Sequence, residues 1–546
     1  MERKSRQKRV GRYFEGVVWH LHVFLTEVLG RISRSSTTPL PQVFPHQRLL
    51  SNILLPAQSP YCIIRLPSDT AAAALASRAM LIQGIYELWG RGPDYSSLRS
   101  NIKEKTSDRW PLYSSCTFSF RIERYRGIQS TPEHTRSIVE SFSFLGFKGK
   151  VQIKNPEASF RVFEEHDLDS TVPKSVFMGR WIADGARDAK HKYDLKKRHY
   201  ISTTSMDAEL ALLTANIALA APGKLFYDPF MGTGGFPLAC AHYGAVVTGS
   251  DIDGRSIRGL GGSARRGQTG RKTVLMNFEQ YGTQGNYLGG FVSDLTNSPL
   301  RVGTITPGAE GAWLDGIVCD PPYGIREGLK VLGPKTEMDD EQRATHLRQC
   351  KEEGYIPPKR PYSFTALLDD ILAFAAATLV PGGRLAMWMP TANDEDIDLL
   401  IPSHPCLQRE EVCVQAFNKW SRRLLVYRRR LPSEINKEEL EELEKRKREY
   451  ETGTRASDLN DFRRKYFEGF REFEDMKKEF IRMKVQAGIR EGEAREEAEL
   501  LEQTRESAAE KAGEVRAVLV GAAEEEDVQG GKADELGRRL GMEAKG

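Results

Sequence analysis

The chain has few cysteines and almost no net charge. Its 546 residues include seven cysteines, and its formal net charge is only +4. No two cysteines form a C-x-x-C pair, so a zinc site built by this chain alone is not expected. With so small a net charge, any basic surface for nucleic acid must be local. Several cysteines lie in apolar runs, as reduced core thiols do, which predicts a reducing, cytoplasmic compartment.

Long hydrophobic runs are also missing. No apolar stretch reaches the roughly 18 residues that a transmembrane helix requires. A chain of 546 residues is long enough for two or three domains with sizeable cores. The sequence therefore predicts a protein of several domains with no membrane partner.

One short apolar run ends in a proline-rich turn. Residues 314–319, LDGIVC, have the composition of a buried strand in a parallel sheet. The strand must stop at Pro321, because proline cannot donate to a β-ladder and Pro322 follows at once. The carboxylate of Asp320 is thereby left at the carboxyl end of a central strand. In open α/β sheets, ligands bind at that edge.

The sequence Asp320-Pro321-Pro322-Tyr323 suits chemistry on an exocyclic amine. Such an amine is a poor nucleophile, because its lone pair is delocalised into the base. A carboxylate and a stiff backbone carbonyl can accept both N–H groups and aim the lone pair at an electrophile. The ring of Tyr323 offers a stacking surface for the base, worth roughly 1–3 kcal/mol. Taken alone, the motif also fits an ordinary turn between a strand and a loop.

Three earlier apolar runs also end at aspartates. Residues 224–227 lead to Asp228 and to a Gly-rich turn through Gly235, where a ligand can approach a helix N-terminus closely. The turn is not G-x-G-x-x-G, so a dinucleotide is not indicated. The next runs end at Asp251 and Asp294, and a carboxylate after the second strand commonly binds ribose hydroxyls. Together the four strand ends predict an adenosine-type cofactor beside an amine-accepting site.

Changes in composition divide the chain into five parts. The leader is basic and contains serines, as an organelle presequence would, but its glutamates argue against that interpretation. Near the end of the fourth part we expect a closing hairpin with Trp420–Arg423 at its turn. The parts are an irregular leader (1–55), a small α+β domain (56–170), a basic linker with a capping helix (171–222), a doubly wound α/β domain (223–432) and a charged helical and disordered tail (433–546).

Two further stretches leave more than one interpretation open. Basic residues beside aromatics in the α+β domain would either follow a phosphate backbone or form a solvated strand face. Residues 326–362 have mixed charge and little apolar content, so they either cover a bound base or form a surface insertion. The basic residues are Arg121, Arg124, Arg126, Lys148, Lys150 and Lys154.

These motifs resemble those of class I, S-adenosylmethionine-dependent amino-methyltransferases. Within that class the chain resembles the catalytic subunit of the eukaryotic tRNA guanosine-10 N2-methyltransferases, over about residues 60–432. The run Asp-Pro-Pro-Tyr-Gly-x-Arg-Glu-Gly is a far more specific motif than Asp-Pro-Pro-Tyr alone. The resemblance is carried by residues 179–185, 193–198, 204–209, 228–235, 250–253 and 320–328.

The resemblance implies a fold and partners. Residues 56–170 would be a ferredoxin-like and THUMP-type region that holds tRNA, followed by a Rossmann-like methyltransferase domain. A small zinc-binding activator subunit would form a heterodimer with this chain, which would need no metal of its own. The family normally opens with a strand and a helix, and residues 1–56 show neither pattern.

The resemblance also implies roles for individual residues. The Gly-rich turn would line the methionine and ribose part of the cofactor, and Asp251 would bind the ribose hydroxyls. Asp294 would lie by the adenine, and Thr204 would approach the cofactor's carboxylate. Asp320 would accept from guanine N2, and Tyr323 would stack on the base. The implied cofactor residues are Thr204, Asp228, Phe230, Gly232, Gly234, Asp251, Ile252, Asp253, Asp294 and Leu295.

Two other functions compete with a tRNA methyltransferase. Amino-methyltransferases that act on DNA or protein share the catalytic motif. A non-catalytic RNA-binding scaffold that kept the fold would carry the same pattern of strands. Binding of S-adenosylmethionine separates the scaffold from the enzymes, and the identity of the methylated product separates the enzymes from one another.

Overall fold

A computed structural model describes residues 21–25, 59–127, 131–168, 170–259, 272–303, 311–325, 329–333, 340–349, 358–392, 401–417, 420–446 and 482. Its contacts divide the chain into two compact units. The first unit is Met1–Ser293 with Trp313–Cys319, and the second is Asp294–Ala312 with Asp320–Gly546.

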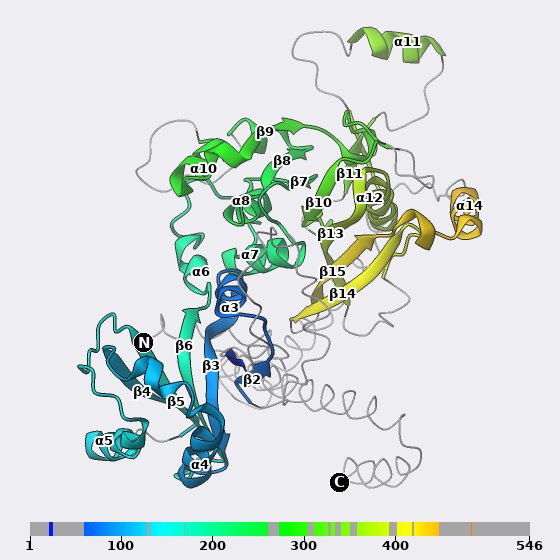
Figure 1. Ribbon diagram of the computed structural model, residues 1–546. Helices are drawn as coiled ribbons and strands as arrows, with labels where there is room; N and C mark the ends of the chain where they lie inside the picture. The colour runs from blue at the N-terminus through cyan, green and yellow to red at the C-terminus, as the bar shows by residue number, and fades with distance from the viewer. Residues whose placement is uncertain are drawn as a thin grey trace, which may run out of the picture. The chain divides into compact units, whose positions relative to one another are not determined.

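The amino-terminal part of the first unit is an α+β domain built on a six-stranded sheet (Figure 1). Helices α4 and α5 bury Leu98, Ile102 and Ile138 in an aromatic core that contains Trp89 and Phe160. The strands, in sheet order, are β2 (Tyr61–Ile64), β1 (Leu21–Leu25), β3 (Ile82–Gly92), β6 (Ser175–Asp184), β5 (Ala158–Glu165) and β4 (Phe118–Tyr125). The helices are α3 (Asp69–Ala76), α4 (Tyr95–Thr106) and α5 (Pro132–Glu140), with 3-10 turns η1 (Trp110–Tyr113) and η2 (Ser143–Leu145).

Two sequence predictions are wrong in this domain. The leader was predicted to be irregular, but Leu21–Leu25 is strand β1 and pairs in parallel with both β2 and β3. Residues 171–222 were predicted to be a linker and capping helix, but Ser175–Asp184 is strand β6 and pairs with β3 and β5. Both strands are stabilised by partners distant in sequence, which no local pattern reveals. The rest of the predicted leader lies outside the described residues.

The second half of the first unit is a parallel α/β arrangement. Strands β10 (Leu314–Cys319), β7 (Leu225–Asp228), β8 (Val246–Asp251) and β9 (Tyr287–Val292) lie side by side in that order, each parallel to its neighbour. The helices are α6 (Asp188–Lys192), α7 (Ala208–Ile217), α8 (Gly235–His242), α9 (Gly254–Ile257) and α10 (Val274–Tyr281), and η3 (Gln284–Asn286) precedes β9. The prediction of a Rossmann-like, mostly parallel sheet after an α+β domain is confirmed.

The second unit holds three antiparallel strands in the order β14-β15-β13, of which β14 and β15 form a long hairpin (Figure 1). The predicted loop at 326–362 is partly regular, because β11 and β12 pair within it and α11 lies between them. The remaining elements are η4 (Leu295–Asn297), β11 (Lys330–Leu332), α11 (Asp340–Gln349), β12 (Lys359–Pro361), α12 (Phe364–Thr378), β13 (Leu379–Ala392), β14 (Leu407–Ala416), β15 (Trp420–Arg429), η5 (Pro432–Glu434) and α14 (Lys437–Arg446).

The predicted charged helix after residue 433 begins as expected, with α14 at Lys437–Arg446. The apolar stripe expected at 462–473 lies outside the described residues. Within the described ranges, no helix has the length and apolar character needed to cross a membrane.

Candidate active site

The carboxyl ends of four parallel strands form one edge of the α/β sheet, because parallel neighbours end at the same side. Strand β7 ends at Asp228 and β8 at Asp251. Asp320 directly follows the last residue of β10, and Asp294 comes two residues after the end of β9. The strand ends that the sequence singled out therefore belong to adjacent strands.

Asp251 links the Gly-rich turn to the end of β8 through a side-chain hydrogen bond. Its Oδ2 accepts the backbone N–H of Gly232 at 2.8 Å, and its Oδ1 accepts that of Asp253 at 2.7 Å. Gly232 and Gly234 have φ values of +52° and +83°, in the left-handed region that favours glycine. Among the described residues other than its chain neighbours, no atom lies within 4 Å of a Cβ placed on Gly232, so that side of the turn is open. The turn is thus held rigidly with space beside it for a ligand.

Other predicted residues around this turn make local hydrogen bonds or ion pairs. Asp228 accepts the backbone N–H of Phe230 at 2.9 Å, which shapes the first corner of the turn. Asp253 caps α9 and forms an ion pair with Arg255 at 2.9 Å. Its carboxylate is therefore occupied locally, and Ile252 beside it is half-buried.

Asp294 uses its side chain to hold the chain that follows. Its Oδ1 accepts the backbone N–H of Thr296 at 3.0 Å, and its Oδ2 accepts that of Leu332 at 2.6 Å. Asp294 and Leu295 are both buried. Each carboxylate oxygen of Asp294 thus accepts one backbone N–H, as each oxygen of Asp251 does.

Ser205, and not Thr204, contacts the Gly-rich turn. Thr204 is exposed, and its hydroxyl lies 3.2 Å from that of Ser202. The hydroxyl of Ser205 lies 3.2 Å from that of Thr233, inside the turn. Ser205 was not among the predicted site residues, although Ser205 belongs to the same run of hydroxyl residues before α7.

In the second unit, Tyr323 supports Asp320 directly. The phenol O–H of Tyr323 donates to Asp320 Oδ1 at 2.5 Å. Burial raises the pKa of Asp320, while the Tyr323 hydrogen bond and the charge of Arg422 lower it. Pro321 is buried and Pro322 is exposed. With one carboxylate oxygen engaged by Tyr323, the other is available to accept from a substrate amine.

Aromatic rings gather around Tyr323 in the same unit. The ring of Trp420 meets that of Tyr323 edge-on, with centroids 6.2 Å apart, and stacks on Phe417 at 4.6 Å. The guanidinium of Arg422 lies over the rings of Trp388 and Phe417, 4.8 and 5.9 Å from their centroids. Of these residues, only Tyr323 was predicted from the sequence to belong to the site.

The expected hairpin turn at Trp420–Arg423 is wrong, because these residues belong to β15. Ser421 pairs with Thr391 of β13 on one side and with Ala416 of β14 on the other. The sequence prediction placed the two strands of the hairpin at 412–417 and 424–427, with these four residues between them. In the structure, strands on both sides supply their partners.

If the chain has the methyltransferase activity that the sequence predicts, Tyr323→Phe should slow methyl transfer about 10- to 100-fold, because it removes a hydrogen bond to the half-buried Asp320 carboxylate while keeping the ring. The affinity for S-adenosylhomocysteine should stay unchanged. Single-turnover rates and calorimetric titration measure the two quantities. A rate equal to that of the parent chain would show that the phenol O–H does not support Asp320.

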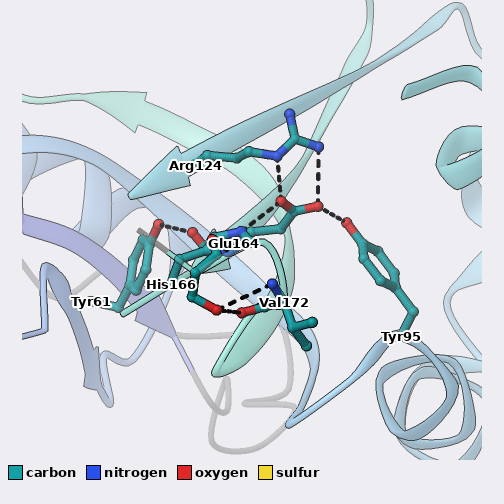
Figure 2. Close-up of polar contacts among 7 residues, drawn as sticks. Tyr61, Tyr95, Arg124, Glu164, His166 and Val172 are labelled. Carbon is teal, nitrogen blue, oxygen red and sulfur yellow. Dashed lines mark hydrogen bonds and ion pairs between the residues drawn. The ribbon is translucent and has the colours of Figure 1, made fainter. Parts of the chain in front are cut away.

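The amino-terminal domain contains a buried ionic network centred on Glu164 (Figure 2). Its carboxylate accepts hydrogen bonds from Tyr95, from Arg124 and from His166, the last at 3.0 Å. The other ring nitrogen of His166 lies 3.1 Å from the carbonyl oxygen of Ser170. Burial raises the pKa of Glu164, but the three hydrogen-bonding side chains outweigh it and hold the pKa below its ordinary value. The network joins α4, β4 and β5.

Glu164→Gln should destabilise the amino-terminal domain by about 3 kcal/mol at pH 7, because it leaves the largely buried guanidinium of Arg124 without its carboxylate. The folded-state pKa of Glu164 is depressed, so its contribution is present above the unfolded pKa and is lost as pH falls through the folded value. The difference between parent and variant should therefore shrink at acid pH. Urea unfolding followed by tryptophan fluorescence from pH 7 to pH 4 measures it, and a constant difference would contradict the assignment.

The six basic residues singled out in this domain differ in how exposed they are. Arg124 belongs to the Glu164 network and is largely buried. The other five are exposed, so a solvated face and a phosphate-binding surface both remain compatible with them. They are Arg121, Arg126, Lys148, Lys150 and Lys154.

Comparison with known proteins places the chain in a family. A family model described as "Tmrp11 THUMP N-terminal domain" matches residues 50–187. The tRNA (guanine(10)-N(2))-methyltransferase of Saccharomyces cerevisiae is 41% identical over 387 residues, which cover 68% of this chain and 84% of that protein. The protein of that name from Homo sapiens is 34% identical over 428 residues, which cover 76% and 87%. With such identity over most of both sequences, this chain belongs to the tRNA (guanine(10)-N(2))-methyltransferase family.

Proposed function

We propose that this chain transfers a methyl group from S-adenosylmethionine to the exocyclic N2 amine of guanosine 10 in a tRNA. The observation that carries the proposal is the Tyr323–Asp320 pair directly after β10, a strand that lies parallel beside the one ending at Asp228. This arrangement offers a half-buried amine acceptor where a Rossmann-like sheet binds its ligands. Membership of the family supports the choice of guanine N2 and of tRNA.

The residues of the first unit fit S-adenosylmethionine. The Gly-rich turn is open beside Gly232, and the Asp251 carboxylate stands at the end of the second strand, where ribose hydroxyls are bound. Asp228, Phe230 and Gly234 shape the same turn. When bound, the cofactor supplies an electrophilic methyl group on a sulfonium.

The protein contributes position and a desolvated acceptor. Asp320 accepts an N–H of the guanine amine and the carbonyl oxygen of Pro321 accepts the other, which directs the nitrogen lone pair at the methyl group. As the N–C bond would form, the C–S bond to the methyl group would break and the neutral thioether would leave, and Asp320 would accept the proton that the nitrogen then loses. The rings of Tyr323, Trp420 and Phe417 supply apolar surface for the base.

The proposed partner is a small zinc-binding activator subunit in a heterodimer. Strand β9 is the outermost of the four parallel strands in the first unit, and its Leu288 and Val292 are 65% and 47% exposed. An outer strand with exposed apolar side chains suits pairing with another chain. The free cysteines of the described segments, most of them buried, fit a cytoplasmic complex.

Methyl transfer to unmodified tRNA, with and without the activator subunit, tests the proposal. Mass analysis of the nucleosides should find N2-methylguanosine, with the yield raised by the activator. Methylation of DNA or protein instead would favour the first competing function. Failure to bind S-adenosylhomocysteine even with the activator present would favour a non-catalytic scaffold.

A further inference from the structure

Arg422 is held in one orientation by its neighbours on both sides. It lies on β15, where it pairs with Gln415 of β14 and Pro390 of β13. Its Nε and Nη2 both donate to Gln415 Oε1, at 3.1 and 2.6 Å. Its guanidinium plane also lies over Trp388, 4.8 Å from the ring centroid. Two hydrogen bonds and a ring contact fix the side chain, and Nη1 has no part in the Gln415 contact.

Arg422 is connected to the Asp320–Tyr323 pair through aromatic rings, because it lies over Phe417, which stacks on Trp420, and Trp420 meets Tyr323 edge-on. In the described part of the chain, the charged and titratable groups that act on Asp320 are Tyr323, from its own loop, and Arg422, from β15. The charge of Arg422 also opposes the rise that burial causes in the pKa of Tyr323. Arg422 therefore contacts Phe417 of the aromatic group, and its charge acts on the Asp320 carboxylate.

We propose that Arg422 is a positioning residue that holds Asp320 as an ionised and correctly oriented acceptor for the target amine. The inference rests on the proposed function. Partial burial raises the pKa of Asp320, and a protonated carboxyl has lost acceptor capacity at one oxygen. Tyr323 supplies a neutral hydrogen bond only. Arg422 supplies the permanent positive charge, because a guanidinium does not lose its proton in proteins.

Arg422→Gln should raise the pKa of Asp320 by about one unit or more, since a neighbouring Arg lowers the pKa of an aspartate by 1–3 units. The single-turnover rate of methyl transfer should then rise with pH along an acid limb shifted upward by the same amount. Arg422→Lys should recover part of the shift, because it restores the charge without the two Gln415 contacts. Arg428→Gln is the matched control, because Arg428 lies on the same strand and bonds Glu410 and Glu434. That variant should leave the acid limb in place.

The outcomes separate a positioning role from a packing role. If Arg422 only fills space between Trp388 and Phe417, Arg422→Gln and Arg422→Lys should lower the rate equally at every pH, which would overturn the inference. A readout independent of transfer is the titration of ¹³C-labelled aspartate carboxyls, with the Asp320 signal identified by its loss in Asp320→Asn. A higher midpoint in Arg422→Gln supports the inference even if the parent chain methylates no tRNA. An unchanged midpoint overturns it, whatever the activity.

Discussion

Asp320→Asn is expected to transfer methyl groups at least about 10³-fold more slowly than the parent chain, while it binds S-adenosylhomocysteine with unchanged affinity. The amide keeps the size of the carboxylate but replaces an acceptor by an N–H₂ donor, which opposes the donors of the guanine amine. The Tyr323 O–H can still donate to the amide oxygen, so the loop should keep its shape. Rapid-quench single turnovers and calorimetric titration measure the rate and the affinity.

A parallel loss of both quantities would contradict this role for Asp320. It would mean that the residue shapes the cofactor site or the fold and does not act on the amine. Tyr323→Phe and Arg422→Gln, which change the surroundings of the same carboxylate, should fall between the parent chain and Asp320→Asn in rate.

Asp251→Ala is expected to weaken S-adenosylhomocysteine binding about 100-fold or more. The substitution removes the acceptor for the ribose hydroxyls, and it also leaves the backbone N–H groups of Gly232 and Asp253 without their carboxylate. Hydrogen bonds to a charged group are worth about 1.5–3 kcal/mol each, so one or two of them account for a loss of this size.

The binding loss should come with a smaller loss of rate at saturating cofactor, because Asp251 does not touch the amine. Glu279→Ala, which removes an exposed acidic side chain of α10, is the control and should bind normally. An Asp251→Ala chain that binds the cofactor as tightly as the control would show that the turn and the ribose contact do not depend on this carboxylate.

The sequence predicted the α/β half well because its strands are short apolar runs that end at aspartates. Strand β6 was missed because its residues were assigned to a basic linker between the two domains. In the sheet, Arg180 binds Glu87 of β3 at 2.7 Å, and this neutralising partner is 93 positions away. The same holds for Arg422, whose orientation depends on Gln415 and Trp388. Local sequence patterns predict apolar strands. They do not predict strands with polar side chains, because the residues that bind those side chains are distant in sequence.

The candidate site was predicted in part for the same reason. The strand-end aspartates and the Gly-rich turn are visible in the sequence. The roles of Asp251 and Asp294 as backbone acceptors across the fold are not, because one of the two N–H groups that each accepts comes from another segment. Likewise, the Tyr323 phenol was expected to offer only a stacking ring, and its hydrogen bond to Asp320 depends on how the proline turn folds back.

Methyl transfer to two matched tRNAs tests the central claim most directly. One carries guanosine at position 10, and the other carries inosine there, which lacks the exocyclic amine but keeps the rest of the base. With the activator subunit present, we expect N2-methylguanosine from the first tRNA and no methyl incorporation into the second. Equal methylation of both tRNAs would contradict the claim that Asp320 presents this amine to the methyl donor.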